Sequence, residues 1–184
     1  MNKETMLTLV DKVIKVDRGG PESRVGKLLT VEEDYITLFT EDEGVIYYYT
    51  HHIKSITDNA KNKMQLNVEI PEDFDFIKGK DFRGTLENLT HRWVKINRGG
   101  SETLEGVMQK VEANNDFVTI VSNEEVIRLS MFHIRNISYG VKVEIPEADE
   151  KENEAKGSNE EKAKEGNKQK ATEDNKQKDT KEES

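Results

Sequence analysis

The residues best suited to chemistry are two copies of an Arg-Gly-Gly motif. The chain reads Arg18-Gly19-Gly20-Pro21-Glu22 near its start and Arg98-Gly99-Gly100-Ser101-Glu102 further along. Paired glycine amides beside a guanidinium suit the binding of a small anion. The same residues also suit a hairpin turn, because glycine adopts positive φ angles without steric cost. Since each motif lies between two β-rich runs, we favour the turn, with Arg18 pairing to Glu22 and Arg98 to Glu102 across it.

The histidines are the next candidates, as metal ligands or general bases. His52 and His133 occupy matching positions, each directly before an isoleucine. The sequence holds no His, Asp or Glu at zinc-finger or metalloprotease spacing. We therefore predict no metal site, and interpret the pair as hydrogen-bonding side chains at tight turns, placed to serve an interface.

Nothing in the sequence indicates catalysis. Cysteine is absent, which excludes thiol nucleophiles, thiolate metal sites and disulfides. Nucleophile-elbow, P-loop and dinucleotide-binding motifs are absent as well. We predict a protein that is not an enzyme, with no catalytic residue and no cofactor. A net charge of −9 also argues against nucleic acid and anionic membranes as partners, because both attract a basic surface.

The two motifs belong to a longer internal repeat. The block Asp34-Tyr35-Ile36-Thr37-Leu38 returns as Asp116-Phe117-Val118-Thr119-Ile120, and His52-Ile53-Lys54-Ser55-Ile56 returns as His133-Ile134-Arg135-Asn136-Ile137. The matched blocks keep their order, and the changes in length fall between them, where loops are expected. We predict two domains: the first repeat, residues 1–72, and the second repeat with its preceding linker, residues 73–146.

Each repeat has the pattern of a small, strongly bent β-barrel. A short helical pattern precedes about five short strands separated by turn residues. Gly26 and Gly106 each lie inside the second strand of a repeat, which is typical of a sharp bend or bulge. We predict a mostly β protein with two tandem Sm-like or SH3-like barrels, each with a short N-terminal helix. Phe74, Phe76 and Phe82 are placed to cover the seam between them.

Three consecutive tyrosines, Tyr47, Tyr48 and Tyr49, fall in the fourth strand of the first repeat. Successive side chains of a strand point to opposite faces, so the three cannot all enter one core. We expect at least one at the surface or at an interface. An exposed aromatic edge of a small open barrel would suit self-assembly or docking of a partner.

Residues 147–184 differ in character from the rest of the chain. They mix Lys and Glu and contain no Val, Ile, Leu, Met, Phe, Tyr or Trp. Such a segment cannot bury enough apolar surface to offset the entropy of ordering it, so we predict a disordered tail. The Lys and Gln side chains of its repeated Asn-Lys-Gln-Lys motif would be accessible to an isopeptide-forming enzyme, although a solubilising role is the simpler interpretation.

The motifs resemble the spore coat protein B family of endospore-forming bacteria. The likeness lies in RGGPES, DYITL and HHIKSI of the first repeat and in HRWVKINRGG and HIRNIS of the second, and spans roughly residues 9–140. It implies a structural protein of the outer spore coat, made in the mother-cell cytoplasm without a signal peptide or membrane insertion. Other coat proteins, or further copies of the chain, would be its partners. The sequence departs from the family in its Lys/Glu-rich tail, and the second repeat reads RGGSET without the proline.

The helix-and-five-strand order also resembles Sm-like barrels in general. Members of that fold class form rings through strand edges and bind RNA in their loops. The function we expect is therefore structural, through protein–protein assembly in the coat, and an Sm-like RNA-binding module is the alternative. The acidic balance of the chain weighs against the alternative.

Overall fold

The computed structural model describes residues 2–58, 64–67, 69–71, 73–113 and 116–140 of the 184-residue chain. Backbone contacts divide the chain into two units, residues 1–143 and 144–184, and every described residue belongs to the first. Both predicted repeats contribute to that first unit. The predicted tail, residues 147–184, lies outside the described residues.

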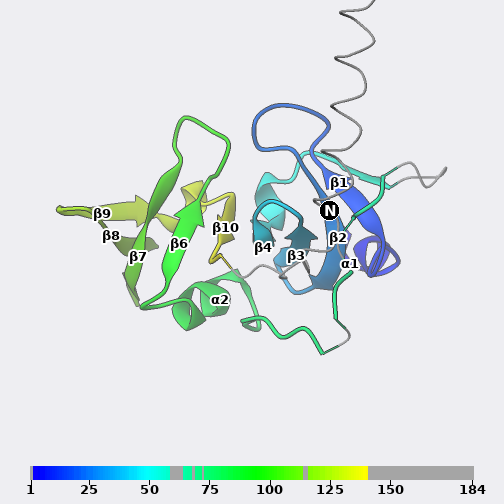
Figure 1. Ribbon diagram of the computed structural model, residues 1–184. Helices are drawn as coiled ribbons and strands as arrows, with labels where there is room; N and C mark the ends of the chain where they lie inside the picture. The colour runs from blue at the N-terminus through cyan, green and yellow to red at the C-terminus, as the bar shows by residue number, and fades with distance from the viewer. Residues whose placement is uncertain (1, 59–63, 68, 72, 114–115, 141–184) are drawn as a thin grey trace, which may run out of the picture. The chain divides into compact units, whose positions relative to one another are not determined.

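The same order of one helix, five strands and one short 3-10 helix occurs twice (Figure 1). The first set is α1 (Lys3–Leu7), β1 (Val13–Val16), β2 (Arg24–Val31), β3 (Tyr35–Thr40), β4 (Gly44–Tyr49), η1 (Thr50–His52) and β5 (Ile56–Asp58). The second set is α2 (Phe82–Asn88), β6 (Trp93–Ile96), β7 (Leu104–Val111), β8 (Phe117–Ser122), β9 (Glu125–Ser130), η2 (Met131–His133) and β10 (Asn136–Ser138).

Local sequence explains where the helices begin and where the first strand of each repeat ends. The side chain of Asn2 accepts a hydrogen bond from the Glu4 amide, and that of Asp81 accepts one from the Gly84 amide, so each helix has a polar N-cap. Asp17 and Asn97 follow β1 and β6 with φ angles of 55° and 51°. Asp and Asn tolerate this left-handed conformation better than other residues with a Cβ, and it ends each strand at the Arg-Gly-Gly motif.

All ten strands form one antiparallel sheet with the order β5-β1-β2-β3-β4-β10-β6-β7-β8-β9. Within each repeat, neighbours in the sequence pair as hairpins. The repeats are joined where β4 pairs with β10, with Tyr47 opposite Ile137 and Ile46 opposite Ser138. Figure 1 shows these two strands side by side between the repeats.

The mostly β class is confirmed, but two tandem barrels are not, because one sheet runs through both repeats. Among the described residues, β5 pairs only with β1 and β9 pairs only with β8, so the sheet is not closed. The physical reason is that β10 occupies the outer edge of β4, which the first repeat would need for its own closure. From the sequence we expected the strand that carries Tyr47, Tyr48 and Tyr49 to be a free edge. This expectation is wrong, because β10 pairs with that strand.

Two strand glycines lie at close approaches between neighbouring strands. A Cβ atom added at Gly26 would lie 2.3 Å from the Phe39 carbonyl oxygen, and one at Gly106 would lie 2.4 Å from that of Val121. In both β2 and β7 the pairing register shifts just after these positions. The glycines thus mark a close strand contact followed by a bulge, the feature that their position in the sequence predicts.

The core consists of two hydrophobic clusters. The first lies within the first repeat and includes Met6, Ile14, Leu28 and Ile46. The second, which we call the shared cluster, combines side chains of both repeats with those of α2. Its buried members are Tyr35, Phe39, Val45, Tyr47, Phe82, Leu86, Leu89, Val94, Ile96, Met108, Val118, Ile120, Ile134 and Ile137.

The linker covers the seam between the repeats, as predicted. Phe74, Phe76 and Ile77 pack against the shared cluster, and Phe82 is buried within it. The rings of Phe39 and Phe74 meet edge to face with centroids 5.5 Å apart. Because one cluster is built from both repeats, their packing against each other is part of the core of the fold. None of the helices in the described part of the chain is long and apolar enough to cross a membrane.

Buried tyrosines should make the stability of the protein fall at alkaline pH. Burial raises the pKa of Tyr35, Tyr47, Tyr48 and Tyr49 above the ordinary value of about 10. The unfolded chain therefore loses phenol protons at lower pH than the folded chain. Below about pH 10 these tyrosines should not change the free energy of unfolding. Above about pH 10 we expect each of them to lower it by up to about 1.4 kcal/mol per pH unit.

Urea denaturation between about pH 8 and about pH 11, followed by tyrosinate absorbance, measures this slope. The variant Tyr48→Phe should show a shallower loss of stability than the parent chain, because one buried phenol no longer ionises on unfolding. A free energy of unfolding that does not change across this range would contradict the linkage.

Candidate functional site

The candidate functional site is the joint between the two repeats. We define the joint as the surface on which β4, Glu43 and residues 21–24 of the first repeat contact β10, residues 98–100 and Arg135 of the second. The joint is where the two Arg-Gly-Gly motifs, the tyrosines and the histidines predicted from the sequence come closest to one another. Its contacts are backbone pairing, aromatic packing and ion pairs.

Backbone pairing extends past the ends of the two short strands. Beyond the paired residues of β4 and β10, the Tyr49 amide donates to the Arg135 carbonyl oxygen at 3.0 Å. On the far side of β10, Ile137 also faces Ile96 of β6. Since β10 has neighbours on both sides, its three residues are fully enclosed, and Asn136, Ile137 and Ser138 are all buried.

The three tyrosines take three different environments. Tyr47 lies in the shared cluster and Tyr48 in the cluster of the first repeat, because they point to opposite faces of β4. Tyr49 is half-buried and stacks on Phe82, with ring centroids 4.9 Å apart. The Tyr47 hydroxyl donates to the Ile77 carbonyl oxygen, which fixes the linker over the joint. The tyrosines thus hold the two repeats and the linker together.

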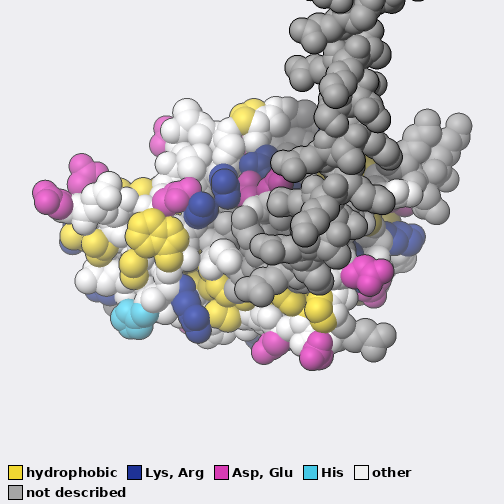
Figure 2. Space-filling model, viewed as in Figure 1, with side chains coloured by type: hydrophobic (Ala, Val, Ile, Leu, Met, Phe, Trp, Pro, Cys, Tyr) yellow, Lys and Arg dark blue, Asp and Glu magenta, His cyan; other side chains and the backbone are white. Residues whose placement is uncertain are grey.

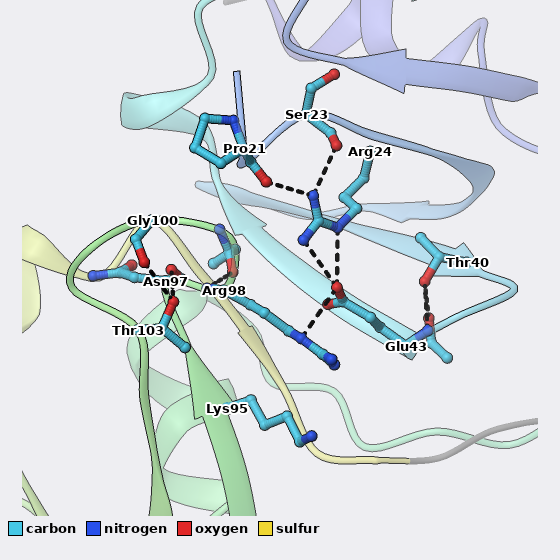
Figure 3. Close-up of polar contacts among 12 residues, drawn as sticks. Pro21, Ser23, Arg24, Thr40, Glu43, Lys95, Asn97, Arg98, Gly100 and Thr103 are labelled. Atoms are coloured by element: carbon cyan, nitrogen blue, oxygen red, sulfur yellow. Dashed lines mark hydrogen bonds and ion pairs between the residues drawn. The ribbon is translucent and has the colours of Figure 1, made fainter. Parts of the chain in front are cut away.

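A buried carboxylate, Glu43, forms the electrostatic centre of the joint (Figure 3). Its Oε1 accepts from Arg24 of the same repeat, at 3.0 Å from Nε and 2.9 Å from Nη2, and pairs with Nε of Arg98 of the second repeat at 3.4 Å. Arg24 also donates to the Pro21 carbonyl oxygen at 2.7 Å. Two guanidinium groups from different repeats therefore compensate one carboxylate that is only 6 % exposed.

A second ion pair crosses the joint between Glu22 and Arg135. This hydrogen bond raises the pKa of the Arg135 guanidinium further above its ordinary value. The cross-turn pairs expected from the sequence, Arg18 with Glu22 and Arg98 with Glu102, are not among the ion pairs of the described residues. The reason is that the joint offers Glu22 and Arg98 partners on the other repeat.

The second Arg-Gly-Gly motif packs against the first at backbone level. Gly99 has a φ of +97°, and a Cβ atom there would lie 1.9 Å from the Pro21 carbonyl oxygen. A Cβ at Gly100 would lie 2.9 Å from Oε1 of Glu22. Around Gly19 and Gly20, by contrast, the space is open. Only the second motif needs its glycines for contact with the other repeat.

The predicted pair of histidines lies at the two 3-10 helices. Nε2 of His52 is 2.6 Å from the Phe132 carbonyl oxygen, so the first histidine bonds the second repeat. The backbone carbonyl of His133 accepts from the Asn97 side chain at 2.8 Å. The prediction that both occupy tight turns matches their position at η1 and η2. No cluster of three or more His, Asp or Glu side chains suited to a metal ion occurs within the described residues.

Both motifs line one open pocket of about 500 Å³. Lys54 and Arg135 give this pocket positive charge, whereas Asp17, Glu22 and Glu102 give it negative charge. An inorganic anion would meet three carboxylates there and would compete with Glu22 for Arg135. The geometry therefore supports the structural interpretation of the Arg-Gly-Gly motifs over the anion-binding one.

The chain resembles a known protein in sequence. No family model matches the chain, and no solved structure matches it. The chain is 38 % identical over 143 residues to spore coat protein B of Bacillus subtilis (strain 168), an alignment that covers 78 % of this chain. Over this stretch the chain is a homologue of spore coat protein B. The resemblance of the repeated motifs to that family is thereby confirmed.

The chain spans about a third of the length of this spore coat protein B, since the alignment covers 36 % of the relative. The same alignment includes 78 % of the residues of this chain.

Sequence reasoning missed Glu43 and Arg24, which form the buried ion pair of the joint. Glu43 lies in an acidic turn, Glu41-Asp42-Glu43, where a solvated face is the ordinary interpretation. Arg24 has no counterpart in the second repeat, which has Leu104 there. One signal was available: an acidic residue stands directly before the fourth strand in both repeats, as Glu43 and as Glu124.

Replacement of Gly99 by alanine should destabilise the fold, whereas the same change at Gly19 should not. The Cβ at Gly99 enters an unfavourable positive-φ conformation and collides with the Pro21 backbone, which cannot move as freely as a side-chain tip. We expect Gly99→Ala to lower the free energy of unfolding by at least about 2 kcal/mol and Gly19→Ala to change it by less than about 0.5 kcal/mol. Urea denaturation of the two matched variants measures both, and equal effects would contradict the close packing of the joint.

Replacement of Glu43 by glutamine should weaken the joint through loss of charge. Arg24 and Arg98 would each lose a charged acceptor at a buried position. We expect a loss of about 1–3 kcal/mol, and less than about 0.5 kcal/mol for Glu124→Gln, the matched exposed position of the second repeat. Chemical denaturation at low protein concentration compares the two. A Glu43→Gln variant as stable as Glu124→Gln would mean that the buried pairs contribute nothing net.

Proposed function

We propose that this protein is a structural component of the bacterial spore coat that acts through protein–protein assembly and not through catalysis. The observation that carries the proposal is the homology to spore coat protein B over 78 % of the chain. The proposal extends to the setting that this family implies: synthesis in the mother cell, incorporation into the outer coat layer, and other coat proteins as partners.

The chemistry of the joint supports a packing role. Its charged groups are directed at other parts of the same chain: Glu43 at two arginines, and Glu22 at Arg135. Its aromatic hydroxyls bond backbone carbonyls of the linker, as Tyr35 does with Gly79 at 2.8 Å. Groups committed in this way stabilise a surface but are not poised to transfer a proton or attack a substrate.

We propose further that each repeat is an Sm-like unit. The order of helix, five strands and an intervening 3-10 helix supports this assignment, as does the strand glycine followed by a bulge in β2 and β7. The return of the last strand to the first, β5 to β1 and β10 to β6, is also of this type. The analogy concerns fold only and carries no RNA-binding activity with it.

The location of the protein in sporulating cells tests the proposal. The full chain, tagged with a fluorescent protein and expressed during sporulation, should accumulate on the forespore surface and remain with the coat fraction of purified spores. Retention of the tagged chain in the mother-cell cytoplasm would overturn the coat role. Binding of purified chain to RNA with a steep salt dependence would replace that role with the nucleic-acid alternative.

A further inference from the structure

The internal joint uses one side of each repeat and leaves the other side of each repeat unused. The first repeat presents its fourth strand, β4, and the second presents its fifth strand, β10. The fifth strand of the first repeat, β5, and the fourth strand of the second, β9, remain at the two ends of the strand order. No described residue pairs with the outer edge of either strand.

We propose that β9 of one copy pairs with β5 of a second copy, in the register that joins β4 to β10 within the chain. This inference deepens the proposed coat role and rests on it, because it names a partner, a second copy of the chain, and the surfaces that meet. Carried over from Ile46 opposite Ser138, the register places Ile127 of one copy opposite Thr57 of the next.

Side chains on the paired strands β4 and β10 are buried, whereas their counterparts on the free strands β9 and β5 are more exposed, as a further contact would require. Val45 of β4 is fully buried, whereas its counterpart Val126 of β9 is 56 % exposed. Tyr35 of β3 is fully buried, whereas its counterpart Phe117 of β8 is 42 % exposed. On the opposite side, β10 is buried throughout, but Ile56 of β5 is half-buried and the next two residues are exposed. The two free edges lack the cover that the joint provides.

The exposed apolar side chains concentrate in the second repeat. Among the described residues, five of the seven exposed large hydrophobic side chains belong to it. Figure 2 shows apolar side chains at the surface over that repeat with acidic side chains beside them. Of these five residues, Val126 on β9 and Phe117 on β8 lie toward the free edge of the second repeat, where an apolar surface with a charged rim is typical of a protein–protein contact. Trp93 on β6 and Val107 on β7 lie on inner strands of the sheet, and the Phe132 ring meets that of His52 with centroids 5.5 Å apart.

Both ion pairs of the joint have counterparts at the free edges. Glu124 stands directly before β9 as Glu43 stands before β4, and Arg18 follows β1 as Arg98 follows β6. The joint pair Arg98–Glu43 therefore predicts Arg18 of one copy bonded to Glu124 of another. Arg18 and Glu124 are both exposed, and neither forms an ion pair with another described residue.

The ion pair between Glu22 and Arg135 also has a counterpart of matching charge at the free edges. Arg135 and Glu22 correspond to Lys54 and Glu102, which are both exposed and keep the signs of their counterparts. Basic residues thus lie on the β5 side of the first repeat and the β10 side of the second, and acidic residues lie on the β4 and β9 sides. Two copies brought together in this orientation match charges of opposite sign, whereas two β9 sides or two β5 sides would oppose like charges.

The first Arg-Gly-Gly motif has room for a partner. In the joint, Gly99 and Gly100 lie against Pro21 and Glu22 of the other repeat. No atom lies within 4 Å of a Cβ built at Gly19 or Gly20. That open space belongs to the pocket that Ser101 and Glu102 of the same chain also line. Ser101 and Glu102 of a second copy would enter it beside Gly19 and Gly20, since they occupy the motif positions of Pro21 and Glu22.

A contact of this kind joins two different surfaces, so each copy keeps one free side after pairing. Association through it continues from copy to copy, and it ends only if the rotation between copies closes a ring. A coat layer requires such extended assembly. A dimer formed by identical surfaces would stop at two copies and would not use this pairing.

Engineered cysteines in the full chain test the register directly. The chain has no cysteine, so each single replacement introduces the only thiol. Residues opposite each other in an antiparallel pair have Cα atoms about 4.5–5.5 Å apart, within the range of about 4.4–6.8 Å for a disulfide. We expect Thr57→Cys mixed with Ile127→Cys to form an intermolecular disulfide on mild oxidation. Thr57→Cys mixed with Glu125→Cys is the control, because residue 125 lies two positions further along β9, out of reach.

The expected yield of mixed disulfide is at least about tenfold above the control pair, since a paired strand raises the effective concentration of the two thiols. Equal yields in the two mixtures would overturn the proposed register. All three replaced residues lie at least partly at the surface, and native circular dichroism of each variant verifies that it folds before the comparison is made.

Charge reversal supplies an independent test that involves exposed residues only. We expect Arg18→Glu and Glu124→Arg each to raise the concentration for half-association, measured by sedimentation velocity, by about threefold to tenfold. The double variant Arg18→Glu with Glu124→Arg should restore association, because it rebuilds the pair with its signs exchanged. A double variant that associates no better than either single one would overturn the pairing of these two residues.

The outcomes separate this inference from the proposed function. A chain that reaches the spore coat, yet stays monomeric at all concentrations and forms no mixed disulfide above the control, would overturn the inference and leave the coat role standing. A chain that cross-links in register but remains in the mother-cell cytoplasm would overturn the coat role alone. Association that appears only after removal of residues 147–184 would mean that this segment, and not a second copy, occupies the edge in the full chain.

Discussion

The pairing of β4 with β10 is the interaction on which the rest of the structure depends. It directs Tyr47 into a cluster built from both repeats, buries Glu43 between arginines of both, and leaves the linker to cover the remaining apolar surface. A repeat of this size buries too little surface to be robust alone, so a common core is a strong stabilising device. The internal duplication thereby becomes one folding unit with a continuous sheet.

Much of this architecture could be predicted from the sequence. The repeated blocks, the turn residues and the strand glycines identified ten short strands and the seam-covering linker close to where the structure has them, and they indicated a short helix before the first strand of each repeat. The route of the sheet could not be predicted. The structure buries β4 on both faces. The sequence does not show whether β5 of the same repeat or β10 of the other covers its edge, because the matching residues 55–57 and 136–138 have the same pattern, Ser-Ile-Thr and Asn-Ile-Ser.

The charges illustrate the same limit. Arg98 and Glu102 are close in sequence, so a cross-turn pair was the reasonable expectation, yet Arg98 bonds Glu43, which lies far away in the chain. Local spacing identifies which residues are near a turn but gives no information on a partner brought in by tertiary packing. Comparison of the repeats carries that information instead. Glu43 and Glu124 keep their sign directly before the fourth strand, although the turns around them differ in length.

The two sides of the repeat have also diverged in a way that distinguishes a permanent contact from an exchangeable one. The internal joint has Tyr47, Tyr48 and Tyr49, whereas the matching residues of β9 are Arg128, Leu129 and Ser130. Arg24, which reinforces Glu43, is replaced by Leu104. Large aromatic groups and a second guanidinium give a joint buried like a protein core, whereas the residues of β9 remain at least partly exposed. In the proposed assembly, the contact between β9 and β5 of two copies is a weaker version of the contact around which the chain folds.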